Sequence, residues 1–351
     1  MISELSNPLL FGVFALAALA VILASIRATA LADILADRTQ IGEAMAGGLI
    51  LGAATSLAGV VVSVNAAWSG DGSYAFSNAV GGIAAQTLFL AIADLLHRRA
   101  NLEHAAAEPA NLFQAVMLIV LLSMPLLAIS GPDVAYFGVH PVSLALFLAY
   151  LAGVKLASSV REDPMWRPVR TSDTRHDEPE DTEEPQKSAR GPAMSFVGLV
   201  AIMGLGGWVI SQTGGVFIER FSLSSSLVGA LVTAVVTSLP EFVTTLVAVR
   251  RGALQLAVGG IIGGNTFDTL FLVAADMAYR DGSIYHATQA NDLYWLATGL
   301  LMTAVLLGGL ILRQREGPGR IGIESVLMMG IYLTAMVIEI FARSPSGAGG
   351  S

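Results

Sequence analysis

The sequence predicts an all-α integral membrane protein with ten transmembrane helices in two inverted-topology repeats of five. Three observations support this fold class: apolar segments long enough to cross a bilayer, an internal match at a fixed spacing, and carboxylates inside two apolar segments. Of the 351 residues, 54% are apolar and 13% are charged, whereas a soluble domain has roughly 25% charged residues. The composition excludes an ordinary soluble domain, and the chain has no basic patch that indicates a nucleic-acid partner.

The apolar segments approach the roughly 20 residues that cross the hydrocarbon core of a bilayer. Five predicted spans precede a polar segment and five follow it. The first span is predicted to be a retained helix rather than a signal peptide. A signal peptide begins with a positively charged region, whereas the residues before this span include Glu4 and no Lys or Arg. The ten spans cover residues 8–26, 42–66, 74–96, 111–130, 139–158, 194–213, 225–249, 254–279, 292–312 and 321–342.

The polar segment, residues 160–193, has few apolar residues to bury and predicts a disordered linker. It separates a first five-helix half, residues 1–159, from a second, residues 194–351. Lys and Arg in short loops favour the cytoplasmic side. With ten alternating helices, ten such residues in short loops fall on one side and three on the other. This predicts a multi-pass protein of the plasma (inner) membrane, with both termini outside and the linker in the cytoplasm.

The two halves match one another at an offset of 182 residues, without a gap in the best part. The matched residues are Thr55, Ser56 and Leu57 with Thr237, Ser238 and Leu239, Gly81 and Gly82 with Gly263 and Gly264, Thr87, Leu88 and Phe89 with Thr269, Leu270 and Phe271, and Ala93 and Asp94 with Ala275 and Asp276. Because each half has an odd number of spans, the second half crosses the membrane in the opposite sense to the first. Inverted repeats place substrate sites near the midplane, where the halves meet.

Two acidic residues, Glu241 and Asp268, lie inside predicted spans. A charge at this depth costs at least about 2.5 kcal/mol, so an acidic residue there indicates a functional site. Pro240 lacks an amide hydrogen and frees backbone carbonyls around Thr237 and Ser238. Calcium and sodium prefer oxygen ligands of these kinds. We therefore predict a cation site with Glu241 and Asp268 as its metal ligands, and with inorganic cations and the lipid bilayer as partners.

The segments TSLPEF at 237–242 and GGNTFD at 263–268 resemble the paired alpha-repeat motifs of the sodium/calcium exchanger, or cation/calcium antiporter, family. The resemblance implies central cation sites built from the second and third helices of each half, and opposing ion flows coupled by alternating access. It also implies that the protein has no cofactor, and that the ion bound at the site is a transported cation, calcium or sodium. The cation-binding residues that it implies are Glu241, Asp268, Thr237, Ser238, Asn265, Thr55, Ser56 and Gln86.

The first repeat departs from the family pattern. Ala58 and Gly59 stand where the family has Pro-Glu, and Gly82, Ile83 and Gln86 stand where it usually has Ser, Asn, and Asn or Asp. The site therefore lacks one formal charge. Two carboxylates can still neutralise one divalent ion, and restoring Pro-Glu at positions 58 and 59 is predicted to strengthen divalent binding.

Alternatives to a secondary active cation antiporter stay open at this point. They are a proton-coupled or monovalent-cation transporter of the same fold, and a sensor or partner subunit that does not transport. A membrane enzyme is disfavoured, because Asp94 and Asp276 are predicted on opposite membrane sides and cannot form a catalytic pair. Each precedes an arginine by four residues, Arg98 and Arg280, which predicts ion pairs at helix ends. The sequence leaves the oligomeric state open.

Overall fold

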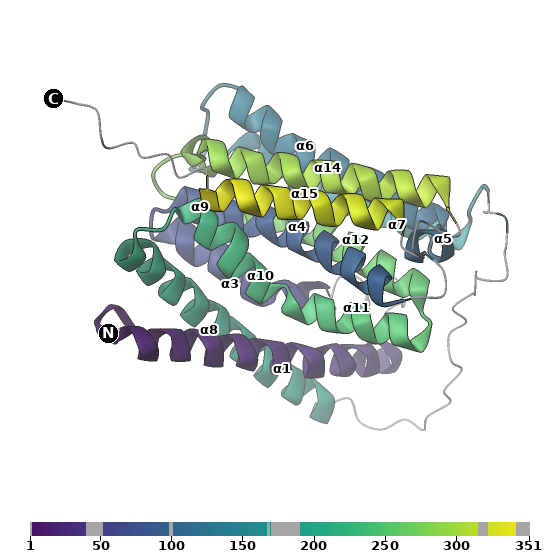
Figure 1. Ribbon diagram of the computed structural model, residues 1–351, viewed down its shortest axis with the longest axis horizontal. Helices are drawn as coiled ribbons and strands as arrows, with labels where there is room; N and C mark the ends of the chain where they lie inside the picture. Colours follow the sequence, from purple (N-terminus) through teal and green to yellow (C-terminus); the bar gives the residue numbers. More distant parts are fainter. Residues whose placement is uncertain are drawn as a thin grey trace.

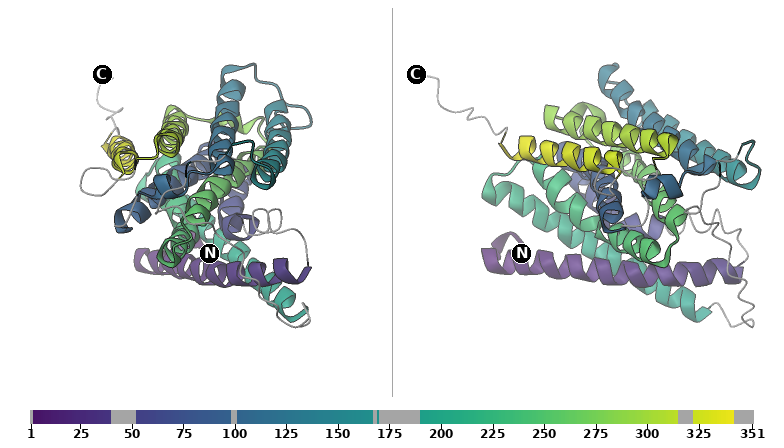
Figure 2. Two further views of the ribbon diagram at one scale, coloured as in Figure 1. Left: turned by 90° about the vertical axis from the view of Figure 1, so that its right-hand side faces the viewer. Right: turned by 45° about the vertical axis from the view of Figure 1, so that its right-hand side comes forward.

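The computed structural model describes residues 2–39, 52–97, 101–166, 169, 190–314 and 322–341, and within these ranges the chain is almost entirely helical. Its long helices run roughly along one axis (Figures 1 and 2). The elements are η1 (Ile2–Glu4), α1 (Asn7–Thr39), α3 (Gly52–Trp68), α4 (Gly72–Leu96), α5 (Leu102–Ala105), α6 (Pro109–Ser130), α7 (Pro141–Glu162), α8 (Arg190–Phe221), α9 (Ser225–Leu227), η3 (Val228–Thr233), α10 (Ala234–Thr237), α11 (Leu239–Arg251), α12 (Leu254–Asp268), α13 (Leu270–Ala278), η4 (Ile284–Ala287), α14 (Ala290–Leu312) and α15 (Ile323–Phe341).

Eight helices of the described residues are long and apolar enough to cross a membrane, or nine if the bent pair Ser225–Thr237 and Leu239–Arg251 is one span. The span predicted at residues 42–66 coincides in part with α3, a shorter apolar helix, and its first ten residues lie outside the described part of the chain. The predicted linker, residues 160–193, also lies largely outside it. The described part of the chain is therefore almost entirely helical, and the protein is a multi-pass integral membrane protein.

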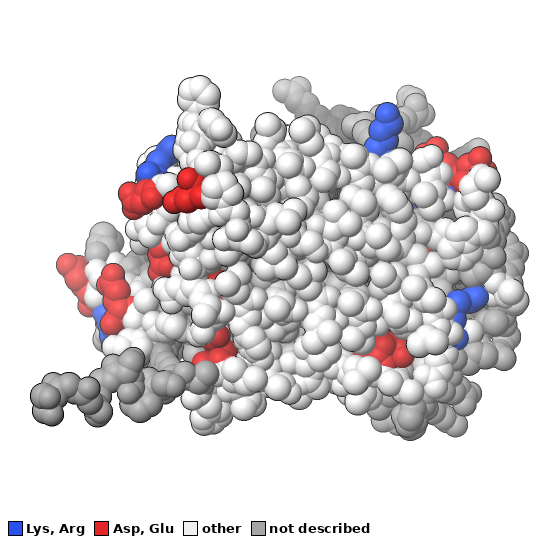
Figure 3. Space-filling model, turned by 90° about the horizontal axis from the view of Figure 1, so that it is seen from above, with Lys and Arg blue, Asp and Glu red and all other residues white. Residues whose placement is uncertain are grey.

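The surface has the polarity that a bilayer requires. A broad band free of charged side chains covers the middle of the face in Figure 3, and acidic and basic residues gather towards its two ends. Large apolar side chains are exposed along the outer helices, among them Leu16, Leu127 and Leu205. Exposed apolar area of this extent marks a surface that faces lipid or a partner rather than water.

Helix α4 is the centre of the bundle. It is buried along most of its length and packs against α3, η3, α10, α12, α14 and α15. An apolar helix with neighbours on all sides shows no single hydrophobic face, and α4 fits that description. Gly81 permits the close approach of η3, because a Cβ atom at this position would collide with the backbone of Ala230. The polar residues of α4 therefore face other helices rather than lipid.

Helices α1 and α8 pack side by side in opposite directions (Figures 1 and 2). Phe11, near the start of α1, stacks on Phe217 and Phe221 near the end of α8, with ring centres 5.1 and 5.8 Å apart. Helix α1 begins and α15 ends at one end of the bundle, whereas α7 ends and α8 begins at the other. We call the latter the linker end, because these two helices flank residues 160–193.

Candidate functional site

The seventh predicted span is broken at the residues that the sequence singles out. Helices α10 and α11 meet at Ser238 with a bend of 43°. Pro240 lies in the first turn of α11, where a missing amide hydrogen leaves no helical bond unmade. One turn earlier the chain forms the π-helix η3, a feature that occurs often at functional sites. The irregular backbone turns Ser238 and Glu241 towards α3 and α4.

Asp268 is the last residue of α12, and it is buried against the first half of the chain. Ser56 Oγ of α3 donates a hydrogen bond to Asp268 Oδ1 at 2.6 Å. Gln86 Nε2 of α4 donates to Asp268 Oδ2 at 2.5 Å. Both carboxylate oxygens therefore have partners, and both partners come from the other half of the molecule.

Glu241 is also buried and reaches the same place from α11. Its Oε1 atom lies 3.5 Å from Ser56 Oγ, and the Thr55 side chain bonds the same carboxylate. Its Oε2 atom is buried without a hydrogen-bond partner, as is Gln86 Oε1. Buried polar atoms normally have a partner, so each exception calls for an explanation such as a bound ion. The unpartnered oxygens are the acceptors that a cation or a proton would satisfy.

The remaining predicted ligands make their hydrogen bonds elsewhere. Thr237 Oγ1 donates to Thr233 O at the end of η3 at 2.9 Å. Asn265 Nδ2 donates to Thr87 Oγ1 at 3.0 Å and so ties α12 to α4. Ser238 Oγ lies 3.5 Å from Gln86 Nε2 and belongs to the cluster. The contacts thus join Thr55, Ser56, Gln86, Ser238, Glu241 and Asp268, which we call the central cluster.

The central cluster contains two carboxylates. Among the described residues, no group of three or more His, Cys, Asp and Glu could hold a metal ion. A cation bound here would therefore rely on Glu241 and Asp268 for charge. Hydroxyl and amide oxygens would complete its shell, as is usual for hard cations.

The contacts of the central cluster repeat at the sequence offset. Gln86 and Asp268, which bond one another, are 182 residues apart. Ser56 and Ser238 have the same separation. The contact of Ser56 with Asp268 is therefore the equivalent of the contact of Ser238 with Gln86. The two halves thus meet at equivalent positions.

The position of the missing first-repeat glutamate is filled by an aromatic ring. Gly59 is the equivalent of Glu241, and a Cβ atom on Gly59 would lie 2.6 Å from Cε2 of Phe271. Phe271 is buried and belongs to the main hydrophobic core. A side chain at position 59 would therefore have to displace the ring.

This packing changes the expected result of restoring the glutamate. We expect Gly59→Glu to lower the free energy of unfolding by roughly 1–3 kcal/mol through overpacking, without tighter calcium binding. The double variant Gly59→Glu with Phe271→Ala should bind calcium more tightly than Phe271→Ala alone, because the space is then open. Thermal unfolding and isothermal titration with calcium measure the two effects. Tighter binding by Gly59→Glu at unchanged stability would contradict the role given to Phe271.

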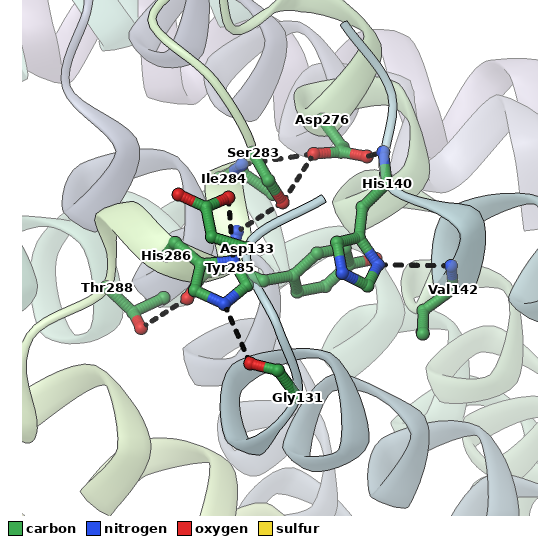
Figure 4. A network of polar contacts seen from close by, with 10 residues as sticks. All are labelled: Gly131, Asp133, His140, Val142, Asp276, Ser283, Ile284, Tyr285, His286 and Thr288. Atoms are coloured by element: carbon green, nitrogen blue, oxygen red, sulfur yellow. Dashed lines mark hydrogen bonds and ion pairs between the residues drawn. The ribbon is translucent and has the colours of Figure 1, made fainter. Parts of the chain in front are cut away.

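The predicted ion pair of Asp276 with Arg280 is wrong. The Asp276 carboxylate instead joins two segments of the chain (Figure 4). It accepts hydrogen bonds from the start of α7 on one side and from Ser283 and Ile284 on the other. The Arg280 guanidinium lies over the Trp68 ring, 4.9 Å from its centre. The donors to Asp276 are His140 N at 2.7 Å, Ser143 Oγ at 2.7 Å, Ile284 N at 3.0 Å and Ser283 Oγ at 3.3 Å.

Asp94 has the same role at the linker end. It accepts from Leu102 N at 2.8 Å and from Gly322 N at 3.2 Å, while Arg98 lies outside the described residues. Leu102 and Ile284 are 182 residues apart, as are His140 and Gly322. The repeat offset therefore extends into the loops, and it matches the loops that bond Asp94 with those that bond Asp276.

The family model described as sodium/calcium exchanger protein matches residues 9–156 and 191–341, most of the chain. The chain belongs to the sodium/calcium exchanger family. The match includes both segments that carry the central cluster, so the resemblance inferred from TSLPEF and GGNTFD is confirmed.

Individual relatives of this exchanger-family protein support the same family assignment. It is 25% identical to the inner membrane protein YrbG of Escherichia coli over 86% of this chain and 88% of that protein. It is 27% identical to the sodium/calcium exchanger MaX1 of Methanosarcina acetivorans over 36% of this chain and 34% of that protein. The fold matches a structure of the sodium-calcium exchanger NCX_Mj with a TM-score of 0.60, at 15% identity, covering 96% of this chain and 99% of that one. The family is one of membrane cation antiporters, which agrees with the expectation that the protein is not an enzyme.

Proposed function

We propose that this protein is a secondary active cation antiporter that works by alternating access, with its cation site in the central cluster near the membrane midplane. One observation carries the proposal: two buried carboxylates of the second half meet hydroxyl and amide groups of the first half, and Glu241 Oε2 is left without a partner. Such groups at membrane depth are costly and mark ion pathways.

The architecture proposed with this function is ten transmembrane helices in two inverted repeats of five, residues 1–159 and 194–351. In it α3 belongs to the second span, and α9 to α11 form the seventh. The repeated contacts of the central cluster and the opposed directions of α1 and α8 support the inversion. The excess of Lys and Arg in loops of one side supports an inner-membrane orientation with both termini outside and residues 160–193 in the cytoplasm.

Calcium and sodium are the proposed cargo. Two carboxylates balance the charge of one divalent ion, and the oxygens of Thr55, Ser56, Ser238 and Gln86 are ligands of the kind that hard cations accept. Thr237 and Asn265 complete the predicted set of cation ligands. In this structure their side chains bond Thr233 O and Thr87 Oγ1 instead. No resident cofactor is required. Because the first-repeat glutamate is absent, we propose a single divalent site.

A second candidate is a proton-coupled or monovalent-cation transporter of the same fold. The unpartnered Glu241 Oε2 atom favours it, because a proton satisfies a buried carboxylate oxygen as well as a cation does. In that case the pH gradient, rather than a sodium gradient, would drive exchange.

A cation-by-cation uptake assay separates these readings. The full chain is reconstituted into liposomes loaded with sodium, potassium or acidic buffer, and uptake of radioactive calcium, sodium and rubidium, the last in place of potassium, is followed in separate experiments. We expect calcium uptake that requires an outward sodium gradient and is reversed by external sodium. Uptake driven only by a pH gradient would select the second candidate. Absence of exchange for every cation and gradient, with folded protein in the liposomes, would indicate a sensor or partner subunit and overturn the proposal.

A further inference from the structure

Three buried carboxyl groups gather at the linker end of the bundle, about two turns further along α4 than Gln86 of the central cluster. Asp94 lies near the end of α4, Glu103 in the short helix α5, and Glu324 at the start of α15 (Figure 1). Their exposed fractions are 2%, 0% and 5%. Burying three acidic groups together is unfavourable unless they are bonded or protonated.

The hydrogen bonds around this acidic cluster leave two oxygens without partners. Asp94 is satisfied by the amides of Leu102 and Gly322. Glu103 Oε1 accepts from Ser325 Oγ at 3.3 Å. Glu103 Oε2 and Glu324 Oε1 are buried and unpartnered. Each of them lies 3.3 Å from the point where a Cβ atom on Gly322 would stand, so the two oxygens face the same small space.

Two basic residues described near this pair, His104 and Arg313, bond backbone oxygens. His104 Nδ1 is 2.6 Å from Arg313 O, and the Arg313 guanidinium donates to backbone oxygens of Val169 and His104. His97 lies at the end of α4. Within the described ranges, no Lys or Arg forms an ion pair with Glu103 or Glu324, and α12 and α14 carry no titratable side chain at this end. Burial first, then the charges of Asp94 and Glu324, raise the pKa of Glu103 to about 8.

We propose that Glu103 and Glu324 hold one proton between them, as a proton-binding site at the linker end that is separate from the central cluster. With the proton in place, one carboxyl group donates to the other and joins α5 to α15. Without it, two like charges face one another in a buried space and repel. The proton therefore stabilises the contact between the first half of the chain and the last helix.

The opposite end of the molecule carries the equivalent network without this acidic pair. Ser143 Oγ lies 3.0 Å from Tyr285 Oη. Figure 4 shows the second contact, in which His286 Nε2 lies 3.4 Å from Gly131 O. Burial raises the pKa of Tyr285 above its ordinary value, so its hydroxyl stays protonated. The equivalent residues are Glu103 and Tyr285, His104 and His286, Ser325 and Ser143, Gly322 and His140, Arg313 and Gly131, and Glu324 and Val142. Tyr285 therefore provides a matched control.

Thermal unfolding of the purified full chain tests the proposal without any transport assay, so it fails or succeeds independently of the proposed function. A carboxyl group whose folded-state pKa is raised stabilises the fold fully below its unfolded pKa and ceases to do so as pH rises through the folded value. From about pH 5 to about pH 9 the wild-type Tm should fall. Glu103→Gln, whose amide can donate to Glu324 at every pH, should flatten this fall and raise the Tm at the alkaline limit.

Tyr285→Phe should lower the Tm but keep the wild-type dependence on pH. If Glu103→Gln does not fold, Glu324→Gln is the second variant and should flatten the curve in the same way. Infrared spectra at neutral pH should show the carbonyl band of a protonated carboxyl group in the wild type, and weakened in either variant. A wild-type pH dependence retained by the glutamine variants, or an unchanged carbonyl band, would overturn the proposal.

Discussion

Replacing Glu241 by Gln is expected to lower cation flux at least about tenfold, since even outer partners of metal ligands cost 10–100-fold in affinity when removed. The amide keeps the size of the side chain and can still accept from Ser56, so the fold should persist. It removes one of the two charges that would balance a divalent ion. Asp268→Asn should have the same effect, with Gln86 turning its amide to present the unpartnered Oε1. Uptake in proteoliposomes, at matched amounts of monodisperse protein, gives the measurement.

Glu339 offers a matched control for this prediction. It is another buried glutamate in a membrane helix, but its oxygens accept from Ser224, Asn291 and Trp295 at 3.2 Å each. Glu339→Gln should therefore keep most of the flux. Unchanged transport by Glu241→Gln would defeat the site assignment, and an equal loss in Glu339→Gln would mean that any buried charge change disables the protein.

Replacing Asp276 by Ala is expected to lower the free energy of unfolding by roughly 3 kcal/mol. The substitution leaves the buried amides of His140 and Ile284 without acceptors, and each unsatisfied buried group costs about 1–3 kcal/mol. Asp276→Asn should cost less, because its amide oxygen can still accept. Thermal and chemical unfolding of the purified protein measure the difference.

Asp133 is the control for Asp276, because it belongs to the same loop network (Figure 4). Its side chain is 66% exposed and lies 3.4 Å from His286 Nδ1. Exposed ion pairs contribute little to stability, so Asp133→Ala should change it by less than about 1 kcal/mol. Equal losses of stability for Asp133→Ala and Asp276→Ala would contradict the role of Asp276 in joining the two segments.

Features that depend on local chemistry could be predicted from the sequence. The break at Ser238 follows from Pro240, and the membrane spans follow from hydropathy. The meeting of Ser56 and Gln86 with Asp268 could be inferred from the repeat offset, since inverted repeats, where they occur, bring their matched segments together where the halves meet. The sequence therefore predicts all six residues of the central cluster, together with Thr237 and Asn265, which bond elsewhere.

Features that depend on packing between distant segments could not be predicted. The space beside Gly59 is filled by Phe271, 212 positions further along the chain, and nothing near Gly59 signals that ring. Asp276 was expected to bond the nearby Arg280, whereas two of its donors come from the start of α7 in the other half. Helix periodicity predicts contacts between side chains three or four residues apart. It does not predict which loop packs across the end of a helix.

The bond between Gln86 and Asp268 has a consequence for how the two halves can pair. If either five-helix half assembled with a second copy of itself, this point would hold two aspartates or two glutamines. Two carboxylates at that separation would repel unless one were neutralised, and two amides would supply no charge for a cation. The difference at this one pair of sites therefore makes the two halves complementary, because each supplies the group that the other lacks.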